Sequence, residues 1–476
     1  MIRFAIVGIG NMGGVHARKL FEGAVKGAEL AAICDISKEK LDNAKEIYGD
    51  RIKYFEDYHE LILSKVADVL LIATPHYYHP IIAEEAFENG WNVLTEKPAG
   101  VDTASVERMN NAALKSGKAF GIMFNQRTDP LYQALRYYIS LGMLGDIKRF
   151  VWIISNWYRT QGYYDSAGWR ATWKGEGGGV LINQCPHNLD LWQWMIGMPS
   201  SVEAHCIKGH FHDIAVEDDA TIYAGYPNGA SAVFITSTGE YPGTNRIEIS
   251  GTLGKAVAED GKLKLFLLHR DETLLRQEKY GFVTDEKVAK IELCFGTNTN
   301  GHLKILQNFT DHLINGEELI APGYEGINSL TISNAAYLSS WLSKRIDFPF
   351  DKELFAREMA KQKDIDKKIN TEKSGTEECK EQRKIMGHHS GICQKDKCHI
   401  HLHSATRTYH LQMPEQAQHC QYHKKDIHPY EDGKSCDPRS HPEYKTDRDA
   451  GKRMIRKQKK TRKIKQDNYK DVTDKI

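Results

Sequence analysis

Arg3-Phe4-Ala5-Ile6-Val7-Gly8-Ile9-Gly10-Asn11-Met12-Gly13 is the stretch that decides the fold of the first part of the chain. An apolar run breaks into three spaced glycines, and a helical pattern follows at once, with Val15, Leu20 and Phe21 on its expected apolar side. This order predicts a strand, a tight turn and a helix N-terminus. Glycines so spaced permit the turn, let the backbone approach a pyrophosphate, and let helix and strand pack closely. Because N–H groups at a helix N-terminus attract anions, we expect a dinucleotide to be bound by Gly8, Gly10, Asn11, Met12 and Gly13.

A carboxylate follows where a dinucleotide-binding unit needs one. The apolar segment Leu30–Cys34 is predicted to be a strand, and it ends in Asp35, about twenty residues beyond the glycine turn, where an acid binds the ribose. The alternative is that Asp35 caps the helix that begins near Ser37. An acid at this position repels a 2′-phosphate, which favours NAD over NADP, although Ser37 and Lys38 leave NADP open.

Strands and helices alternate through residues 1–122. We expect further helices near 38–47, 80–88 and 103–116, and further strands at 67–73, 91–95 and 119–122. This rhythm predicts an α/β Rossmann domain with a doubly wound parallel sheet. Ligands of such sheets bind beyond the carboxyl ends of the strands, so the residues that follow each strand are the candidates for function.

Two of these strand ends carry polar groups, Thr74-Pro75-His76-Tyr77-Tyr78-His79 and Thr95-Glu96-Lys97-Pro98. Pro98 keeps Lys97 out of the helical region and cannot donate to a sheet, so a lysine is held at a strand end near the expected nicotinamide. The alternative is a surface ion pair between Glu96 and Lys97. We expect further cofactor contacts from Thr74, Pro75, His76, His79, Glu96, Lys97 and Asn125.

The pattern changes after Asn125-Gln126-Arg127. Strands are expected at 147–158, 201–210, 220–226, 230–238, 246–250 and 262–268, and helices near 130–141, 302–314 and 324–344. Short polar turns such as Pro227-Asn228-Gly229 join the strands, which indicates an open, largely antiparallel sheet. We therefore predict an α+β substrate domain over residues 123–360, closed by the last two helices.

The densest cluster of chemical groups lies between Gly175 and Trp194. Pro186 suits a first helical position, and His187 and Asp190 are three residues apart on one helix face. A histidine in a first helical turn feels the positive helix end, which disfavours its protonated form and keeps it available as a base. The alternative is that His187 only caps the helix.

Together these residues resemble the Gfo/Idh/MocA family, which includes glucose–fructose oxidoreductase and inositol dehydrogenase. The resemblance covers residues 1–360 and is carried by the glycine turn, Asp35, Thr74-Pro75 with His79, Glu96-Lys97-Pro98, Gly177-Gly178-Gly179 with His187, and the helix 335–340. Members use NAD(P) to oxidise or reduce a hydroxyl group of a sugar or polyol. They often form homodimers or homotetramers through the large sheet.

The resemblance implies that Lys97 hydrogen-bonds the reacting hydroxyl group and that His187 is the general acid/base. Asn183 departs from the pattern, because inositol dehydrogenase-like members have an aspartate there, and an amide cannot relay a proton. The stretch 156–164, with Trp169 and Arg170, is similar to subgroups that act on glucosides or anhydrosugars. A sugar, glycoside or polyol substrate is expected to be contacted by Gln126, Arg127, Tyr158, Arg159, Trp169, Arg170, Asn183, His187 and Asp190.

The composition of the 476 residues fits an enzyme of the cytoplasm. The chain begins without a charged and then apolar leader, and no apolar run approaches the ~18 residues of a membrane span. We expect no membrane or nucleic-acid partner. Cys34, Cys185, Cys206 and Cys294 show no pairing pattern and are expected to be reduced thiols.

The last part of the chain, 371–476, has another character. It carries 24 Lys and Arg against 16 Asp and Glu, ten histidines, and neither Phe nor Trp. Such a segment cannot bury enough apolar surface to offset its ordering entropy, so we expect disorder or an out-of-frame extension after 369. Cys393, Cys398, His399, His401 and His403 match no two-pair zinc spacing, and we expect no metal site. The basic run 452–465 lacks the aromatics or fold that nucleic-acid binding needs.

Two other functions use the same features. An NAD-dependent glycoside hydrolase would oxidise a ring hydroxyl group transiently and release no net NADH. A dinucleotide-sensing regulator would need neither Lys97 nor His187. The dehydrogenase accounts for both residues and is the favoured interpretation.

Overall fold

The fold is described from a computed structural model, which describes residues 1–279, 281, 287–296 and 298–366. The predictions for 371–476, including the histidine and cysteine cluster and the basic run, lie outside the described residues. Among the described residues, every helix is too short or too polar to cross a lipid bilayer.

The first sheet has six parallel strands in the order β3-β2-β1-β4-β5-β6. The strands are β1 (Ile2–Val7), β2 (Ala28–Cys34), β3 (Lys53–Phe55), β4 (Val69–Ile72), β5 (Asn92–Thr95) and β6 (Phe120–Ile122). The chain reverses direction across the sheet between β1 and β4, and a crevice at such a point is where dinucleotides bind. The predicted Rossmann fold is confirmed.

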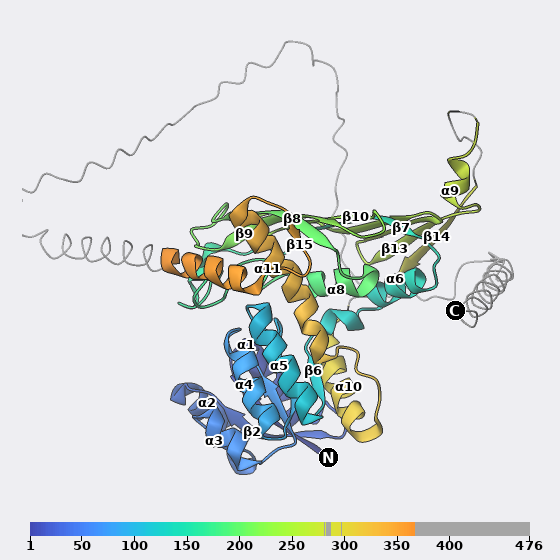
Figure 1. The fold of residues 1–476 in the computed structure, drawn as a ribbon. Helices are drawn as coiled ribbons and strands as arrows, with labels where there is room; N and C mark the ends of the chain where they lie inside the picture. Colours follow the sequence, from blue (N-terminus) through green and yellow to red (C-terminus); the bar gives the residue numbers. More distant parts are fainter. Residues whose placement is uncertain (280, 282–286, 297, 367–476) are drawn as a thin grey trace, which may run out of the picture. The chain divides into compact units, whose positions relative to one another are not determined.

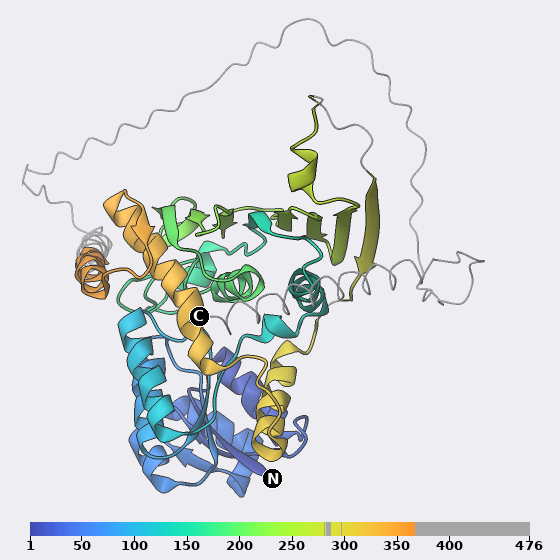
Figure 2. The same ribbon diagram turned by 45° about the vertical axis from the view of Figure 1, so that its right-hand side comes forward.

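Helices cover both faces of this sheet. They are α1 (Asn11–Phe21), α2 (Lys38–Tyr48), α3 (Tyr58–Ser64), α4 (Tyr78–Glu88), α5 (Thr103–Ser116) and α10 (Gly301–Asn315). Figure 2 shows α4 and α5 on one side of the sheet and α10 on the other. Ile305, Leu306 and Phe309 of α10 are buried in the core of the six-stranded sheet, so the expectation that this helix closes the second domain is wrong.

The second sheet has nine strands in the order β14-β13-β12-β11-β7-β10-β9-β8-β15. The strands are β7 (Ile147–Ile154), β8 (Ser201–Lys208), β9 (Glu217–Gly225), β10 (Ser231–Ser237), β11 (Asn245–Gly251), β12 (Gly254–Glu259), β13 (Lys262–Leu268), β14 (Val288–Cys294) and β15 (Ile346–Asp347). Only the pair of β7 and β10 is parallel among the described pairs. The predicted largely antiparallel α+β arrangement is confirmed.

Helices pack on one face of the nine-stranded sheet (Figure 1). They include α6 (Pro130–Ser140), α8 (Pro186–Ile196) and α11 (Gly326–Leu342). The same part of the chain also contains two short helices, α7 (Gln161–Asp165) and α9 (Glu272–Leu275). Trp192 of α8 stacks between Phe150 of β7 and Phe234 of β10, with ring centroids 5.7 and 5.8 Å apart. This aromatic stack fixes α8, and therefore the residues at its N-terminus, on the sheet.

Helix α11 joins the two sheets (Figures 1 and 2). The buried side chain of Asn334 accepts a hydrogen bond from Thr103 N at 3.2 Å and donates to Val101 O at 3.0 Å. This buried amide ties α11 to the first domain, because losing either bond would leave a buried polar group unpaired. Helix α11 therefore connects the two domains through a buried contact.

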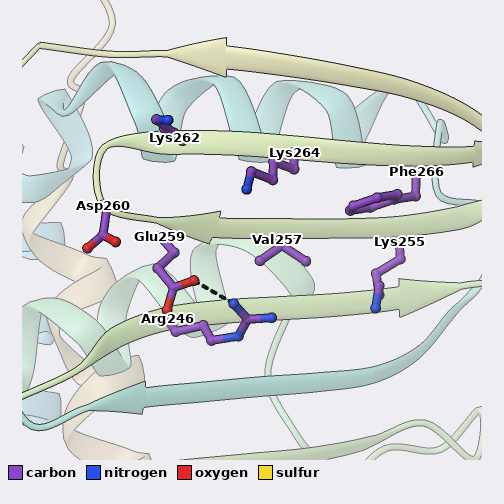
Figure 3. A pocket seen from close by; sticks show the side chains of 8 residues that line it. All are labelled: Arg246, Lys255, Val257, Glu259, Asp260, Lys262, Lys264 and Phe266. Carbon is purple, nitrogen blue, oxygen red and sulfur yellow. Dashed lines mark hydrogen bonds and ion pairs between the residues drawn. The ribbon is translucent and has the colours of Figure 1, made fainter. Parts of the chain in front are cut away.

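Strands β11, β12 and β13 of the nine-stranded sheet form a hollow of about 340 Å3 (Figure 3). It is lined by Arg246, Lys255, Val257, Glu259, Asp260, Lys262, Lys264 and Phe266. Arg246 forms an ion pair with Glu259 at 2.5 Å. No residue predicted for the functional site lines this hollow.

Two details of the sequence prediction are wrong. Val15 is exposed, and the buried face of α1 is formed by Gly13, His16, Ala17 and Leu20. Strands β3, β12, β14 and β15 and helices α3, α7 and α9 were not predicted.

Candidate active site

The glycine turn between β1 and α1 has the shape that an anion site needs. Gly8 has φ +88°, and a side chain on Gly13 would place its Cβ 1.9 Å from Gly8 O. A Cβ on Gly10 would meet no atom within 4 Å, so the backbone is open on that side. Helix α1 starts after Gly10 without a side-chain cap and without an acidic residue in its first turn. These N–H groups therefore fit a phosphate group.

Asp35 lies next to this turn. Its carboxylate accepts hydrogen bonds from Ile9 N and Ser37 N, both at 2.9 Å, and forms an ion pair with Lys40 at 3.6 Å. The N-cap of α2 is Ser37, whose own hydroxyl group accepts from Lys40 N. The alternative that Asp35 is the cap of this helix is therefore wrong, and its carboxylate is positioned beside the glycine turn.

The segment after β4 is tied to the segment after β5 by His79. Its two ring nitrogens lie 2.8 Å from Pro98 O and 2.7 Å from Thr74 O. Burial lowers the pKa of His79, whereas the two carbonyl groups favour its protonated ring. The His79 side chain thus links the segment after β4 to the segment after β5.

His76 points toward the second domain. Its Nδ1 donates to Glu176 O at 2.9 Å, and its ring lies edge-on to Trp169 with centroids 6.0 Å apart. Burial, with the charges of His79 and Lys97, lowers the pKa of His76 to about 3. A neutral His76 therefore links the end of β4 to the glycine-rich segment. Pro75 O accepts from Tyr78 N at 3.0 Å and starts the turn into α4.

Glu96 is buried and paired with a residue that the sequence prediction missed. Its Oε1 lies 2.7 Å from His16 Nε2 on α1. Burial would raise the pKa of Glu96, but the hydrogen bond and charge of His16 and the charge of Lys97 lower it to about 2. The alternative of a surface ion pair between Glu96 and Lys97 is wrong. The buried carboxylate instead accepts a hydrogen bond from the main-chain N of Lys97 at 3.2 Å.

Lys97 reaches from the end of β5 into the second domain. Its Nζ donates to Asn183 O at 3.0 Å. Burial lowers its pKa, and the charges of Glu96 and Glu176 act in the opposite direction. An ammonium group with a lowered pKa gives up its proton more readily than that of an exposed lysine.

His187 lies at the second position of α8, four residues beyond Asn183. Its pKa is lowered well below the usual value by burial first and by the charge of Lys97 second. The pKa of His187 is lowered, as the sequence predicts, but burial and not the positive end of the helix is the main cause. No side chain caps α8, which argues against the alternative role of His187 as a cap. Its ring packs edge-on to Phe124, with centroids 6.1 Å apart, and its buried Nδ1 has no partner in the described structure.

Glu176 is the main residue that the sequence prediction missed. It is 1% exposed, and its carboxylate accepts hydrogen bonds from Ala171 N at 2.7 Å and from the Asn183 side-chain amide. Arg170 Nη1 lies 3.6 Å away. Burial raises the pKa of Glu176 to about 7. The sequence carries no local signal for this residue, because its burial and its partners depend on how the surrounding segments fold together.

Aromatic and guanidinium groups surround this carboxylate. The Arg170 guanidinium lies over the rings of Trp169 and Tyr163, at 4.5 and 4.7 Å from their centroids. Arg159 lies over Tyr163 at 5.0 Å and donates to Tyr158 O at 2.9 Å. The Tyr158 side chain is exposed and packs toward Tyr241, away from the described contacts of this cluster.

Arg127 and Asp190 are engaged with each other. Their side chains are each 1% exposed and form two hydrogen bonds of 2.6 and 2.7 Å. Arg127 also pairs with Glu325 at 2.5 Å. Because all charged groups are used, we revise the expected role of this pair from substrate contact to support of α8.

Several buried polar atoms near the crevice have no hydrogen-bond partner among the described residues. Buried donors and acceptors are normally paired, so such a cluster marks a place where a ligand can supply partners. Asn125 Nδ2 also lies 3.4 Å from His302 Nδ1. The unpartnered atoms in the predicted segments are Thr74 Oγ1, Asn125 Oδ1, Gln126 Oε1, Arg170 Nε, Gln184 Oε1, His187 Nδ1 and Asn188 Nδ2.

Two protein-family models match this chain. The model described as "Oxidoreductase family, NAD-binding Rossmann fold" matches residues 2–124. The model described as "GFO/IDH/MocA C-terminal domain" matches residues 132–257. Together they cover more than half of the chain, and they assign NAD binding to the domain that carries the glycine turn.

Similar proteins include two inositol dehydrogenases. The inositol 2-dehydrogenase of Salmonella typhimurium is 34% identical over 145 residues, which span 30% of this chain and only 43% of that relative. The myo-inositol 2-dehydrogenase of Thermotoga maritima is 24% identical over 70% of this chain and 95% of its own length. Among solved structures, the WlbA dehydrogenase of Bordetella pertussis in complex with NADH and UDP-GlcNAcA is 27% identical, with a TM-score of 0.61, over 74% of this chain and 99% of that chain.

Proposed function

Because the chain belongs to the Gfo/Idh/MocA family of oxidoreductases, we propose that it is an NAD-dependent dehydrogenase of a sugar, glycoside or polyol. The reaction moves a hydride between the nicotinamide ring and a carbon that bears a hydroxyl group. The observation that carries the proposal is the bond from Lys97 Nζ to Asn183 O, since it brings the end of β5 to the segment that leads into His187.

The residues that would hold NAD are those of the first domain. The open backbone at Gly10 and the uncapped first turn of α1 fit the pyrophosphate, and the Asp35 carboxylate fits a ribose hydroxyl pair. NADP is disfavoured, because its 2′-phosphate would meet this buried carboxylate. NAD, when bound, supplies the acceptor for the hydride that leaves the substrate carbon.

Lys97 and His187 would handle the proton of the substrate hydroxyl group. A neutral His187 offers a ring nitrogen that can take this proton during oxidation. The ammonium form of Lys97 would stabilise the negative charge that develops on the oxygen as the hydride leaves. The ionised Glu96, fixed by His16, keeps Lys97 charged in spite of its burial.

The substrate class is supported by the groups around the crevice. Arg170, whose buried Nε has no partner among the described residues, offers a donor for the hydroxyl groups of a sugar or cyclitol ring, and Asn183 and Gln184 offer amide groups. The inositol dehydrogenases and the UDP-GlcNAcA-bound dehydrogenase among the similar proteins act on or bind molecules of this kind.

The proposed function is tested by a screen for NADH. The purified protein is incubated with NAD and, separately, with inositols, aldoses, uronic acids and aryl glucosides, while NADH absorbance and released aglycone are followed together. A dehydrogenase forms NADH in proportion to the substrate consumed. Release of aglycone without net NADH would instead establish the hydrolase, and neither signal with any substrate would contradict both enzymes.

We also propose a homodimer or homotetramer that forms through the nine-stranded sheet. The hollow over β11, β12 and β13 presents both lysine and glutamate side chains, which can pair across a two-fold axis (Figure 3). Sedimentation at two salt concentrations tests this assembly. A monomer at all protein concentrations would contradict it.

A further inference from the structure

A second buried carboxylate, that of Glu176, lies beside Asn183, and the mechanism above does not use it. Glu176 accepts hydrogen bonds from Ala171 N on one oxygen and from the Asn183 side-chain amide on the other. Arg170 is 3.6 Å from the second oxygen. A carboxylate that is 1% exposed costs free energy unless its partners compensate, so its presence beside the crevice calls for a role.

The Asn183 amide has only one arrangement that satisfies these neighbours. Its Nδ2 donates one hydrogen to Glu176 and the other to Tyr163 Oη at 3.1 Å. A flipped amide would place Oδ1 against the carboxylate, and two acceptors would then repel each other. In the observed arrangement, Oδ1 accepts no hydrogen bond within the described structure, and Asn183 is half-buried.

The Tyr163 hydroxyl group complements this free acceptor. It accepts from Asn183 Nδ2 and from Arg170 Nη1 at 3.0 Å, and Gln184 Nε2 lies 3.4 Å away. Its lone pairs are therefore occupied, and its own hydrogen is left to donate. Asn183 and Tyr163 thus present one acceptor and one donor. An alcohol group, which both donates and accepts, matches this pair.

The position of the pair relates it to the reacting carbon. The main-chain oxygen of Asn183 accepts a hydrogen bond from Lys97 Nζ. The Asn183 side chain therefore belongs to the same residue that binds the proposed catalytic amine. Resting on the proposed function, we propose that Glu176 is a positioning residue that fixes the Asn183 amide to accept from a substrate hydroxyl group next to the one that is oxidised. The preferred substrates are then vicinal diols, such as cyclitols and pyranoses, rather than isolated alcohols.

The charge of Glu176 would make this recognition depend on pH. Its pKa is raised to about 7 by burial, against the charges of Arg170 and Lys97. The Asn183 amide, which donates to Glu176, also donates to Tyr163 Oη. His76 Nδ1 donates to the main-chain oxygen of Glu176. Below this pKa the neutral acid attracts the amide hydrogen less strongly than the carboxylate does, so substrate binding should strengthen as the pH rises through neutrality.

Steady-state kinetics of Glu176→Gln, Asn183→Ala and the double variant test the proposal. We expect Glu176→Gln to raise KM for a diol substrate about tenfold, with KM for NAD changed less than about twofold, and to remove the neutral ionisation from the pH profile of kcat/KM. In the Asn183→Ala background, Glu176→Gln should have no further effect on KM. An unchanged KM in the single variant, or an equal effect in both backgrounds, would overturn the proposal.

Glu217 provides a matched control. It is also fully buried with a pKa raised to about 7 by burial, but it accepts hydrogen bonds from Gly179 N, Leu181 N and Tyr337 Oη. Glu217→Gln should lower Tm and leave the pH profile of kcat/KM unchanged. If it moved the pH profile as Glu176→Gln does, the effect would reflect general loosening, and the proposal would be contradicted.

A measurement without turnover separates this inference from the proposed function. The side-chain amide signals of selectively ¹⁵N-labelled asparagine are followed against pH, and the Asn183 signal is identified by its loss in Asn183→Ala. It should titrate near neutrality in the wild type and stay constant in Glu176→Gln. Absence of this titration overturns the inference even if NADH forms, whereas its presence in a protein that forms no NADH refutes only the proposed function.

Discussion

Lys97 Nζ donates to Asn183 O at 3.0 Å, and this bond joins the edge of the six-stranded sheet to the segment before α8. The two residues are 86 positions apart in the chain. Because a buried ammonium group needs partners, the bond places the lysine in the crevice instead of in solvent. His187 follows Asn183 by four residues and is the second residue of α8, so the bond brings the lysine to the segment that carries the imidazole.

The glycines of the first turn should separate folding from cofactor binding. Gly13→Ala would place a Cβ 1.9 Å from Gly8 O, so we expect a large loss of Tm or no folded protein. Gly10→Ala has open space and should fold, but its methyl group would face the pyrophosphate and raise Kd for NAD at least about tenfold. Thermal unfolding and NADH titration measure the two effects. Tight NADH binding by a folded Gly10→Ala would refute this placement of the cofactor.

Asp35 should decide between NAD and NADP. Asp35→Ser keeps an acceptor for Ile9 N and removes the negative charge, so we expect NAD to bind about tenfold more weakly and the preference over NADP to shrink. Asp42→Ser, on the exposed side of α2, is the control and should bind both cofactors as the wild type does. The ratio of kcat/KM for the two cofactors is the measurement. An unchanged ratio in Asp35→Ser would remove this residue from the ribose site.

The pair of Arg127 and Asp190 should contribute to stability more than to binding. Removing one partner leaves a buried charge, so Asp190→Ala should lower the free energy of unfolding by about 3–5 kcal/mol. The double variant Arg127→Met/Asp190→Leu should regain part of this loss, because neither charge is then buried alone. Chemical denaturation of the three proteins tests this. A stable Asp190→Ala with a raised substrate KM would restore the original expectation of substrate contact.

Burial of His76 should make the protein sensitive to acid. Its pKa is lowered to about 3 in the fold, whereas an unfolded histidine titrates near 6.5, so only the unfolded chain takes up this proton in between. The contribution is therefore complete above about pH 6.5 and falls as the pH decreases, by about 2 kcal/mol at about pH 5. His76→Gln keeps a donor for Glu176 O and should lose less stability on acidification.

The control for this prediction is His205→Gln, because His205 is exposed on β8. It should lose as much stability as the wild type between about pH 7.5 and about pH 5. Equal acid sensitivity of His76→Gln and the wild type would mean that His76 is not buried as a neutral ring.

Much of the fold could be predicted because its signals are local. The glycine turn, the strand and helix periods of the first domain and the turn at Pro227-Asn228-Gly229 all depend on neighbouring residues, and α5 was predicted with its observed bounds, Thr103–Ser116. The missed elements lack such signals. β3 has three residues, and β14 is exposed on both faces over most of its length, so neither shows a buried stripe.

The site was less predictable because it depends on contacts between distant segments. The positions of Asp35, Lys97 and His187 follow from motifs, but the partners of these residues do not. His16 lies on the buried face of α1, where the sequence prediction placed Val15 instead. Glu176 is buried through contacts with Arg170 and Asn183 that only the folded chain brings together. Arg127 and Asp190 have the polar side chains of a binding site, and only the structure shows that they neutralise each other.

The central claim is that Lys97 and His187 act on one hydroxyl group. Single-turnover NADH formation by the wild type, Lys97→Ala, His187→Ala and the double variant, all saturated with NAD, tests it most directly. Groups that act as a unit are not additive, so each single variant should be at least about a hundredfold slower and the double variant little slower than the worse single one. A near wild-type rate of hydride transfer in either single variant would contradict the account.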